Sequence, residues 1–411
     1  MNLKEPKLAF NVEIHKPITV SDAVASISSG TSVNSEDTPV SDDTKLGVLK
    51  TSCVSDGRFI PSENKTILKS EYSRVKQPVK SGEVIVSRMN TPLLVGEVGY
   101  VTSSHSNLFL PDRLWALKVQ QNFNARWLTY YLTTPKIKFR LKELATGTSG
   151  SMKNISQPSF LGIQLHAPKH QEQQKIADFL TAVDTKINQI TEKHRLLKEY
   201  KKGVMQQLFS QKIRFKDEGD KAFPDWTQER LDYFIERISD PVSVDSQTEY
   251  REIGIRSHGK GIFHKESTTG DDIGNKRVFW VKPNALVLNI VFAWERAVAV
   301  TSNDENGFIA SHRFPMYIPK ANRADVNYLL YFFLSPKGEA LLNLASPGGA
   351  GRNKTLGQSE FMKLKVRLPS QQEQQKIAQF LQALDSKIAA VSEQIEQTKQ
   401  FKKGLLQQMF V

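Results

Sequence analysis

The sequence Gln-Glu-Gln-Gln-Lys-Ile-Ala occurs twice in the chain, at residues 171–177 and at residues 372–378. The offset of 201 residues continues without a gap to the Gln-Gln-Leu-Phe of residues 206–209 and the Gln-Gln-Met-Phe of residues 407–410. About half of the aligned positions in this stretch are identical. A unit of roughly 200 residues is too long for a solenoid repeat. The chain is therefore predicted to hold a duplicated domain and a duplicated connector.

Both repeated segments carry the pattern of a long heptad helix. A 4-3 series of positions runs over residues 176–208 and over residues 377–409, and eight of the ten positions in each series are apolar. Such a period over more than four heptads is typical of a coiled coil. We expect the two helices to pair antiparallel, with the polar seam residues His194, Lys201, Thr398 and Lys402 setting the register. The alternative is that each helix packs only on its own globular half.

The remaining sequence is predicted to form two similar α+β domains. Strand-like runs occur at residues 83–86, 114–117, 285–288 and 297–300, and helical stretches follow at 125–134 and 326–334. The predicted division of the chain is a first α+β domain at 1–165, a helix at 166–212, a second α+β domain at 213–367 and a helix at 368–411. The expected fold class is thus α+β with an internal pseudo-two-fold repeat.

The charge of the chain favours a polyanionic partner. Lys and Arg number 56 against 43 Asp and Glu, which gives a formal net charge of +13. Cations that neutralise phosphates release condensed counterions, so nucleic acid is a natural partner for such a surface. Cys53 is the single cysteine, and the sequence has neither a signal-peptide core nor a membrane-length apolar run. A cytoplasmic location is expected.

The sequence carries no recognisable catalytic motif. It lacks the Asn-Pro-Pro-Tyr set of amino-methyltransferases and a well-spaced nuclease motif. Residues 254–261 come close to a phosphate-binding loop, but Gly261 stands where a Ser or Thr would bind Mg²⁺. One cysteine and scattered histidines cannot assemble a zinc site by spacing. We expect no enzyme activity, no metal and no cofactor in this chain.

Each half ends in a Gly-rich, polar loop, at residues 146–154 and 346–355. Glycines let the backbone approach a phosphate, and Arg, Asn and His reach base edges. Either loop could equally be a plain surface turn. The DNA-binding candidates in the first half are Arg58, Arg88, Asn90, Thr91, Arg113, Ser151, Lys153 and Asn154. Those in the second half are Arg256, His258, Lys260, Arg296, His312, Arg313, Arg352, Asn353 and Lys354.

The layout resembles the specificity subunits of type I restriction–modification enzymes. The resemblance rests on two Pro-x-x-x-Glu-Gln-x-x-Ile segments, at residues 168–176 and 369–377, and on Phe-Pro-Asp-Trp at 223–226. The first half has no counterpart of Trp226, which leaves the start of its domain uncertain.

The resemblance implies that each variable half reads one part of an interrupted, asymmetric DNA target. It implies that two modification subunits, carrying S-adenosylmethionine, dock on the exposed faces of residues 172–209 and 373–410. Restriction subunits that use ATP and Mg²⁺ would join them. The alternative from another class is a coiled-coil scaffold without sequence-specific DNA binding, in which case deleting either half would leave DNA affinity unchanged.

Overall fold

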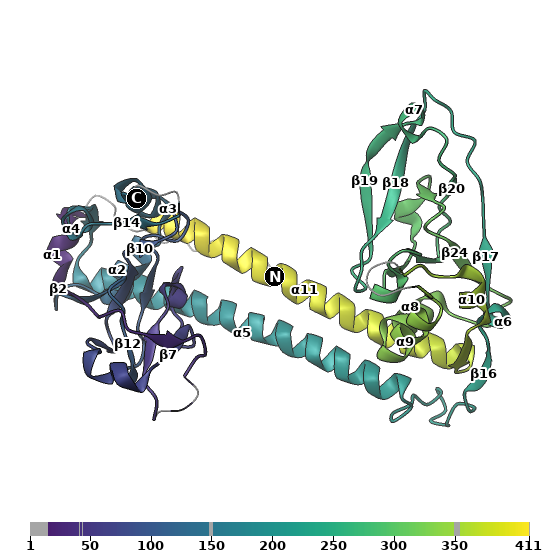
Figure 1. The fold of residues 1–411 in the computed structure, drawn as a ribbon, viewed down its shortest axis with the longest axis horizontal. Coiled ribbons are helices and arrows are strands. Elements are labelled where there is room, and N and C mark those ends of the chain that lie inside the picture. The colour runs from purple at the N-terminus through teal and green to yellow at the C-terminus, as the bar shows by residue number, and fades with distance from the viewer. Residues whose placement is uncertain (1–14, 41, 43, 148–150, 349–353, 411) are drawn as a thin grey trace. The chain divides into compact units, whose positions relative to one another are not determined.

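The computed structural model describes residues 15–410 except 41, 43, 148–150 and 349–353. These residues form two compact units. The first unit holds the chain up to Ile190 together with Gln394 onward, and the second unit holds Thr191–Glu393. Each unit contains a mixed α/β domain and parts of two long helices (Figure 1). These helices are α5 (His170–Phe209) and α11 (Gln371–Met409), as the heptad pattern predicts.

The domain of the first unit is built on two sheets. One has the order β2-β13-β9-β11-β6-β5, and the other has the order β3-β7-β4-β12-β8. The strands of the first sheet are β2 (Val24–Ser29), β5 (Val54–Ser55), β6 (Gly57–Phe59), β9 (Val84–Ser87), β11 (Val98–Tyr100) and β13 (Leu114–Val119). Those of the second are β3 (Ser35–Glu36), β4 (Gly47–Leu49), β7 (Asn64–Ile67), β8 (Pro78–Val79) and β12 (His105–Phe109). Two short pairs join β1 (Lys16–Thr19) to β15 (Gln164–Ala167) and β10 (Met89–Asn90) to β14 (Lys153–Asn154).

The domain of the second unit repeats this plan with fewer strands. Its sheets have the orders β17-β24-β21-β22 and β19-β18-β23-β20. The strands are β17 (Ile235–Ile238), β18 (Glu249–Ile255), β19 (Ile262–Thr269), β20 (Val278–Trp280), β21 (Leu286–Leu288), β22 (Val298–Val300), β23 (Ile309–Ser311) and β24 (Met316–Pro319), with β16 (Thr227–Arg230) paired to β25 (Lys365–Leu368). Residues 254–261 end β18 and form the turn into β19, so they lack the strand–loop–helix context of a phosphate-binding loop.

Short helices complete both domains, and sequence signals explain where they begin. The side chain of Asn124 caps α2 (Ala125–Leu132) by accepting from the Trp127 amide, and Asp325 caps α8 (Val326–Leu334) in the same way. Proline occupies the first turn of α3 (Pro135–Leu144) and of α9 (Pro336–Leu344). The others are α1 (Val20–Ala23), α4 (Gln157–Leu161), α6 (Leu231–Phe234), α7 (Gly270–Ile273) and α10 (Gln358–Lys363).

The long helices pack against each other and against the domains. In the first unit, Leu180 near the start of α5 and Leu405 near the end of α11 belong to one core with Trp127 of α2. Phe410 lies edge-on to the ring of Tyr131, with centroids 5.0 Å apart. The two helices are antiparallel, since residues that lie later on α5 meet residues that lie earlier on α11. The predicted pairing of the helices is therefore confirmed, and the alternative that each helix packs only on its own globular half is wrong, because the helices contact both the domains and each other.

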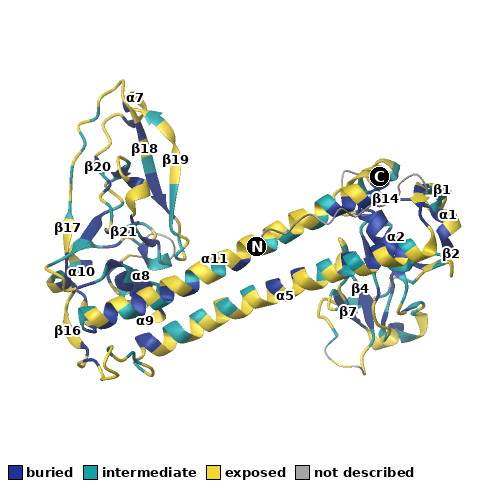
Figure 2. Cartoon of the chain, turned by 180° about the vertical axis from the view of Figure 1, so that it is seen from behind, coloured by how far each residue is buried: buried dark blue, intermediate teal, exposed yellow. Residues whose placement is uncertain are grey.

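The second unit repeats this core with the roles of the helices exchanged. Phe209 at the end of α5 packs on Tyr328 and Phe332 of α8, with centroids 5.7 and 6.0 Å apart, and Leu381 of α11 joins the same core. Figure 2 shows buried residues gathered in α2, α8 and the sheets, whereas the long helices carry exposed residues along much of their length. Among the residues that the structure describes, no helix is long and apolar enough to span a membrane.

A buried glutamine in each repeated segment fixes the domain to its helix. Gln173 and Gln374 are 1% and 0% exposed. The Gln173 side chain accepts a hydrogen bond from the backbone amide of Asn124 at 2.9 Å and donates one to the Pro168 carbonyl at 2.9 Å. Gln374 makes the same two bonds, from the Asp325 amide and to the Pro369 carbonyl. This pairing explains the Pro-x-x-x-Glu-Gln spacing, because the glutamine joins the start of the long helix to the cap of the domain helix.

An ion pair between the long helices recurs in both units. In the first unit, Lys402 Nζ lies 2.7 Å from Asp184 Oδ1, and the Tyr130 hydroxyl donates to Asp184 Oδ2 at 2.8 Å. Burial and the neighbouring carboxylate raise the pKa of Tyr130, so the hydroxyl keeps its proton. We call this group the first latch.

In the second unit Lys201, Asp385 and Tyr331 form the second latch. The Lys201 Nζ lies 2.6 Å from Asp385 Oδ1, and the Tyr331 hydroxyl donates to Asp385 Oδ2 at 2.7 Å. The two seam lysines therefore bind carboxylates of the opposite helix, which fits their predicted role in setting the register.

The two domains enter their long helices differently. The Glu373 carboxylate, which is 0% exposed, accepts from Arg214 at 2.8 and 3.1 Å and from Trp226 Nε1 at 3.2 Å. In the first unit the equivalent Glu172 faces His15, with 3.9 Å between Oε1 and Nε2. The missing counterpart of Trp226 thus corresponds to a real structural difference.

Candidate nucleic-acid interface

Three segments far apart in the sequence meet at one point of the first unit. The Arg88 amide donates to the Arg113 carbonyl at 3.1 Å, and the Ile155 amide donates to the Arg88 carbonyl at 2.9 Å. These bonds join the loop after β9, the turn before β13 and the strand β14, which contains Lys153 and Asn154. Four predicted residues therefore lie in one cluster, which we call the first basic cluster: Arg88, Arg113, Lys153 and Asn154.

The second unit builds the same junction. The Ile290 amide donates to the Arg313 carbonyl at 3.0 Å, and the Leu356 amide donates to the Ile290 carbonyl at 2.8 Å. Arg313 therefore occupies the position of Arg113, and Lys354 occupies that of Lys153. We call this group, with His312, the second basic cluster. The predicted residues Arg352 and Asn353 lie outside the described residues.

Side chains in the first basic cluster divide into exposed and engaged groups. Arg113 is exposed, and so is the nearby Thr91, which directly follows β10. The Arg88 side chain instead donates to the Asp112 carbonyl at 2.7 Å and to Asn154 Oδ1 at 2.9 Å, beside the Trp115 ring. Arg88 and Asn154 therefore hold the junction together, whereas Arg113 stays exposed.

Asn90 does not fit the predicted role of a base contact. It is 7% exposed, and its side chain donates to Ser87 Oγ and accepts from the Thr91 amide. A buried amide with both ends bonded cannot turn outward without leaving polar groups unpaired. We therefore remove Asn90 from the candidates.

The basic side chains of the loop strands have local partners. Lys153 Nζ donates to the Gly147 carbonyl at 3.2 Å. Lys354 Nζ lies 3.3 Å from Asn343 Oδ1 and 5.4 Å from the centre of the Trp294 ring. Ser151 is exposed. Lysines held in this way act as phosphate contacts more readily than as base readers.

The other predicted residues lie at the hairpin turns that face the long helices. In the first unit, Arg58 donates to Asn188 of α5 at 3.2 Å. In the second unit, Arg256 packs over the Phe263 ring at 4.7 Å, and Lys260 is exposed at the tip of the turn. The structure thus separates these residues from the basic clusters.

His258 and Arg296 lie together at the same turn. The backbone amides of His258 and Gly259 donate to the carbonyls of Glu295 and Arg296, at 2.7 and 3.0 Å. The loop after β21 therefore touches both places in the second unit, since it begins at Ile290 in the second basic cluster and ends at Arg296.

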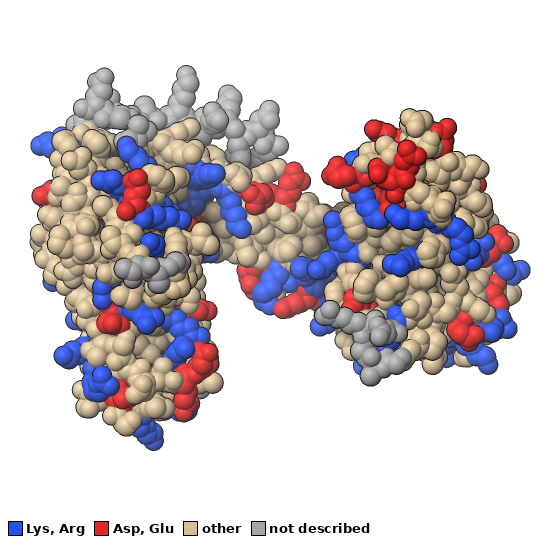
Figure 3. Space-filling model, turned by 45° about the horizontal axis from the view of Figure 1, so that its top comes forward, with Lys and Arg blue, Asp and Glu red and all other residues tan. Residues whose placement is uncertain are grey.

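One exposed arginine was missed from the sequence. The His312 amide donates to the Arg277 carbonyl, which places the exposed Arg277 beside the second basic cluster. No signal in the sequence marks Arg277, because it precedes a strand paired to a distant part of the chain. Figure 3 shows Lys and Arg gathered in a band across one face of the second unit, with acidic residues at its upper end.

Two domains of one plan, each with a basic cluster of similar backbone and different side chains, define a two-domain nucleic-acid-binding protein. The chain matches the family described as "Type I restriction modification DNA specificity domain" over residues 23–198 and 279–400, more than half of its length. It belongs to this family.

Named relatives and solved structures agree with this assignment. The chain is 23% identical over 345 residues to the protein named as the MjaX type I restriction enzyme specificity subunit of Methanocaldococcus jannaschii, covering 79% of this chain and 76% of that protein. It is also 23% identical over 290 residues to the MjaVIII specificity subunit of the same organism, covering 65% and 66%. The crystal structure of a type I restriction–modification S subunit from M. genitalium has the same fold, with a TM-score of 0.57, 15% identity and coverage of 97% and 96%. Membership of this family does not favour the scaffold alternative.

Proposed function

We propose that this chain is the non-catalytic DNA sequence-recognition subunit of a type I restriction–modification complex. One observation supports the proposal most strongly. The same three-segment junction recurs in both units, but the residue beside its exposed arginine differs, with Asp112 before Arg113 in one and His312 before Arg313 in the other. Two domains that share a backbone arrangement but carry different side chains suit a DNA target with two parts of different sequence.

In this proposal the exposed arginines Arg113 and Arg313 read base edges. Arg donates two bonds to guanine O6 and N7 in the major groove, and each such contact is worth about 1–3 kcal/mol of discrimination. The lysines of the same clusters hold phosphates and set the position of each domain on the duplex. The chain would act in the cytoplasm, on chromosomal and incoming DNA.

The proposed partners are double-stranded DNA, two modification subunits and restriction subunits. S-adenosylmethionine, ATP and Mg²⁺ would be bound by these partners. The proposed docking faces are the exposed sides of residues 172–209 and 373–410. Tyr200 and Phe401, 53% and 44% exposed, occupy equivalent positions of the repeat on these faces. Exposed aromatic side chains are frequent anchors of protein interfaces.

Adenine methylation mapping tests the proposal in cells that express the chain with its modification partner. We expect a two-part motif that is absent without the chain. Arg113→Ala is expected to relax one part of the motif, and Arg313→Ala the other part. A motif unchanged by both variants would contradict these roles. A confirmed complex that yields no motif would contradict sequence recognition itself.

The proposed stoichiometry has its own test. Tyr200→Ala and Phe401→Ala are each expected to weaken binding of one modification subunit, which native mass spectrometry would show as a complex with one copy. Retention of two copies by the double variant would exclude these residues as anchors.

A further inference from the structure

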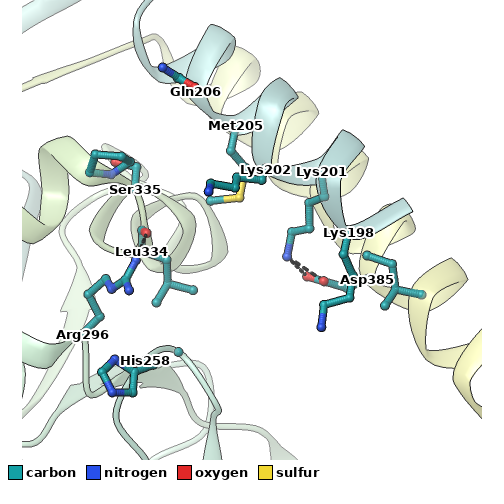
Figure 4. A pocket seen from close by; sticks show the side chains of 13 residues that line it. Lys198, Lys201, Lys202, Met205, Gln206, His258, Arg296, Leu334, Ser335 and Asp385 are labelled. Carbon is teal, nitrogen blue, oxygen red and sulfur yellow. Dashed lines mark hydrogen bonds and ion pairs between the residues drawn. The ribbon is translucent and has the colours of Figure 1, made fainter. Parts of the chain in front are cut away.

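A pocket of about 390 Å³ lies in the second unit between α5 and the turn that joins β18 to β19. Its basic lining comes from Lys198, Lys201 and Lys202 of α5, from His258 of the turn and from Arg296. Figure 4 shows the three lysines extending from one side and His258 and Arg296 bordering the space from the other. Basic side chains from three separate segments therefore line the pocket.

The charges of this pocket are only partly neutralised. Asp385 is the acidic residue of its lining, and this carboxylate is already bound by Lys201 and Tyr331 in the second latch. Lys198, Lys202 and His258 have no side-chain partner among the residues that the structure describes. Three donors therefore remain for a ligand.

Arg296 adds an unsatisfied donor. Within the described part of the chain, its Nε is buried without a hydrogen-bond partner, and its Nη1 reaches the Leu334 carbonyl only at 3.5 Å and Glu339 at 3.6 Å. A buried N–H without an acceptor costs free energy, even though the Arg296 side chain as a whole is 32% exposed. The pocket is therefore incomplete as a structural ion-pair site.

The equivalent place in the first unit has the opposite arrangement. There Lys138 of α3 binds both Asp56 and Glu97, with Nζ–O distances of 2.6 and 2.7 Å. Asp56 occupies the turn position of His258, and Glu339 of α9 occupies the position of Lys138. The first unit thus neutralises its own charges at this place, and the cationic pocket belongs to the second unit.

Arg296 stands at a backbone position where the first unit has the glycine Gly96. Arg296 has φ of 60°, and Gly96 at the equivalent end of the loop has φ of 83°. Glycine adopts this left-handed conformation without steric cost, whereas arginine does not. An arginine at such a position places a charge in the pocket at some backbone cost.

The floor of the pocket is apolar. Met205, Leu334, Pro336 and Ile388 line it. Apolar walls lower the local dielectric and strengthen the attraction of the cations for an anion. They also offer contact to a deoxyribose ring, which a small inorganic anion would not need.

We infer that this pocket binds a sugar–phosphate unit of the DNA backbone. Lys198, Lys202 and Arg296 face the phosphate, and the apolar floor contacts the sugar. This inference rests on the proposed function. It adds a contact outside both basic clusters that fixes position without reading sequence.

The test measures binding of the full-length chain to random-sequence duplex DNA over a range of salt concentrations. The variant Lys198→Gln/Lys202→Gln removes two charges and keeps an unbranched polar side chain and a similar helix propensity. Its matched control is Lys399→Gln/Lys403→Gln, which makes the same changes at the equivalent exposed positions of α11. Equal far-UV circular dichroism would confirm that both variants fold.

We expect the pocket variant to lower the slope of log K against log salt by about 0.9, since the inference places one phosphate in the pocket and each phosphate contact contributes about that amount. Binding at 0.15 M salt should weaken by about 10-fold on every sequence. The control should change the slope by less than about half of that amount. Arg296→Gly, which suits the φ of this residue, should lower the slope by about 1.

Three outcomes would overturn the inference. One is an equal loss of slope in the pocket variant and the control, which would indicate general charge. Another is tight binding of inorganic phosphate or dAMP to the pocket with unchanged DNA binding, which would indicate a free phosphate ligand. The third is loss of the modification subunit with unchanged DNA binding, which would indicate a protein carboxylate. Failure of the proposed function would give a different result from failure of this inference. The wild-type chain would then bind target and random duplexes equally, and the salt slopes of the variants would still show whether the pocket contacts a phosphate.

Discussion

Replacing Asp184 by asparagine tests whether the first latch stabilises the first unit. The variant keeps the shape of the side chain and an oxygen for the Tyr130 hydroxyl, but removes the charge that Lys402 meets at 2.7 Å. The side chains of Lys402 and Asp184 are 14% and 18% exposed. The change therefore leaves a largely buried ammonium facing a neutral amide.

The magnitude follows from this burial. A hydrogen bond to a charged group contributes about 1.5–3 kcal/mol, and breaking a fully buried ion pair costs about 3–5 kcal/mol. We expect Asp184→Asn to cost about 2–3 kcal/mol. The matched control is Asp385→Asn in the second latch, where the carboxylate is 45% exposed. Solvent screens that pair, so its loss should cost about 1 kcal/mol.

Hydrogen exchange measured by mass spectrometry on the full chain assigns the loss to one unit. Asp184→Asn should lower the opening free energy of peptides from α2 and from residues 402–409, and Asp385→Asn that of peptides from α8. Adding Lys402→Met to Asp184→Asn should cost less than the sum of the two single changes, because the partners are coupled. Equal losses for the two asparagine variants, within about 0.3 kcal/mol, would refute the reasoning from burial.

Three further outcomes follow from buried groups. Burial raises the pKa of the Cys53 thiol far above its usual range, so we expect Ellman's reagent to label the native chain only after unfolding; rapid labelling of folded protein would contradict this. Burial alone would raise the pKa of Glu305, but hydrogen bonds from His264 and from Ser302 lower it below the usual value of 4.5. The Glu305 carboxylate therefore stabilises the fold above that pH, and this stabilisation is lost as the pH falls through the lowered pKa. The difference in unfolding free energy between wild type and Glu305→Gln should therefore shrink below about pH 4.5, and a difference that grows on acidification would show the sign to be wrong. Gln374→Leu should cost about 2–3 kcal/mol in urea unfolding, because it leaves the Asp325 amide and the Pro369 carbonyl without partners; a loss below about 0.5 kcal/mol would mean that water replaces the glutamine.

Local signals in the sequence predicted most of the architecture. The repeat is visible because two contiguous segments match each other at an offset of 201 residues, and the heptad period lies within each segment. The two long helices and the duplication could therefore be predicted from the sequence alone. The same pattern marked Lys201 and Lys402 as polar seam residues. It could not name their partners, since Asp184 and Lys402 are 218 positions apart and meet only because the helices are antiparallel.

The candidate site was less predictable, because the environment of each side chain is set by distant segments. Arg88 and Arg113 are both arginines beside predicted strands. The structure separates their roles, since Arg88 finds Asn154 66 residues away while Arg113 stays exposed. Gln173 and Gln374 show the opposite case. They belong to the most obvious repeat in the chain, yet only the structure shows that they join a helix cap to a proline carbonyl.

The composition of the first unit has a consequence for synthesis on the ribosome. Its core needs Leu405 and Phe410, which emerge only after the whole of Thr191–Glu393 has been made. Roughly 280 residues separate Trp127 from Leu405, so at about 5–20 residues per second the Trp127 surface waits roughly 14–56 s for the segment that covers it. The second unit is one continuous stretch and can close first. The nascent chain is thus expected to complete its later half before its earlier half, and to depend on whatever shields an open apolar face in the interval.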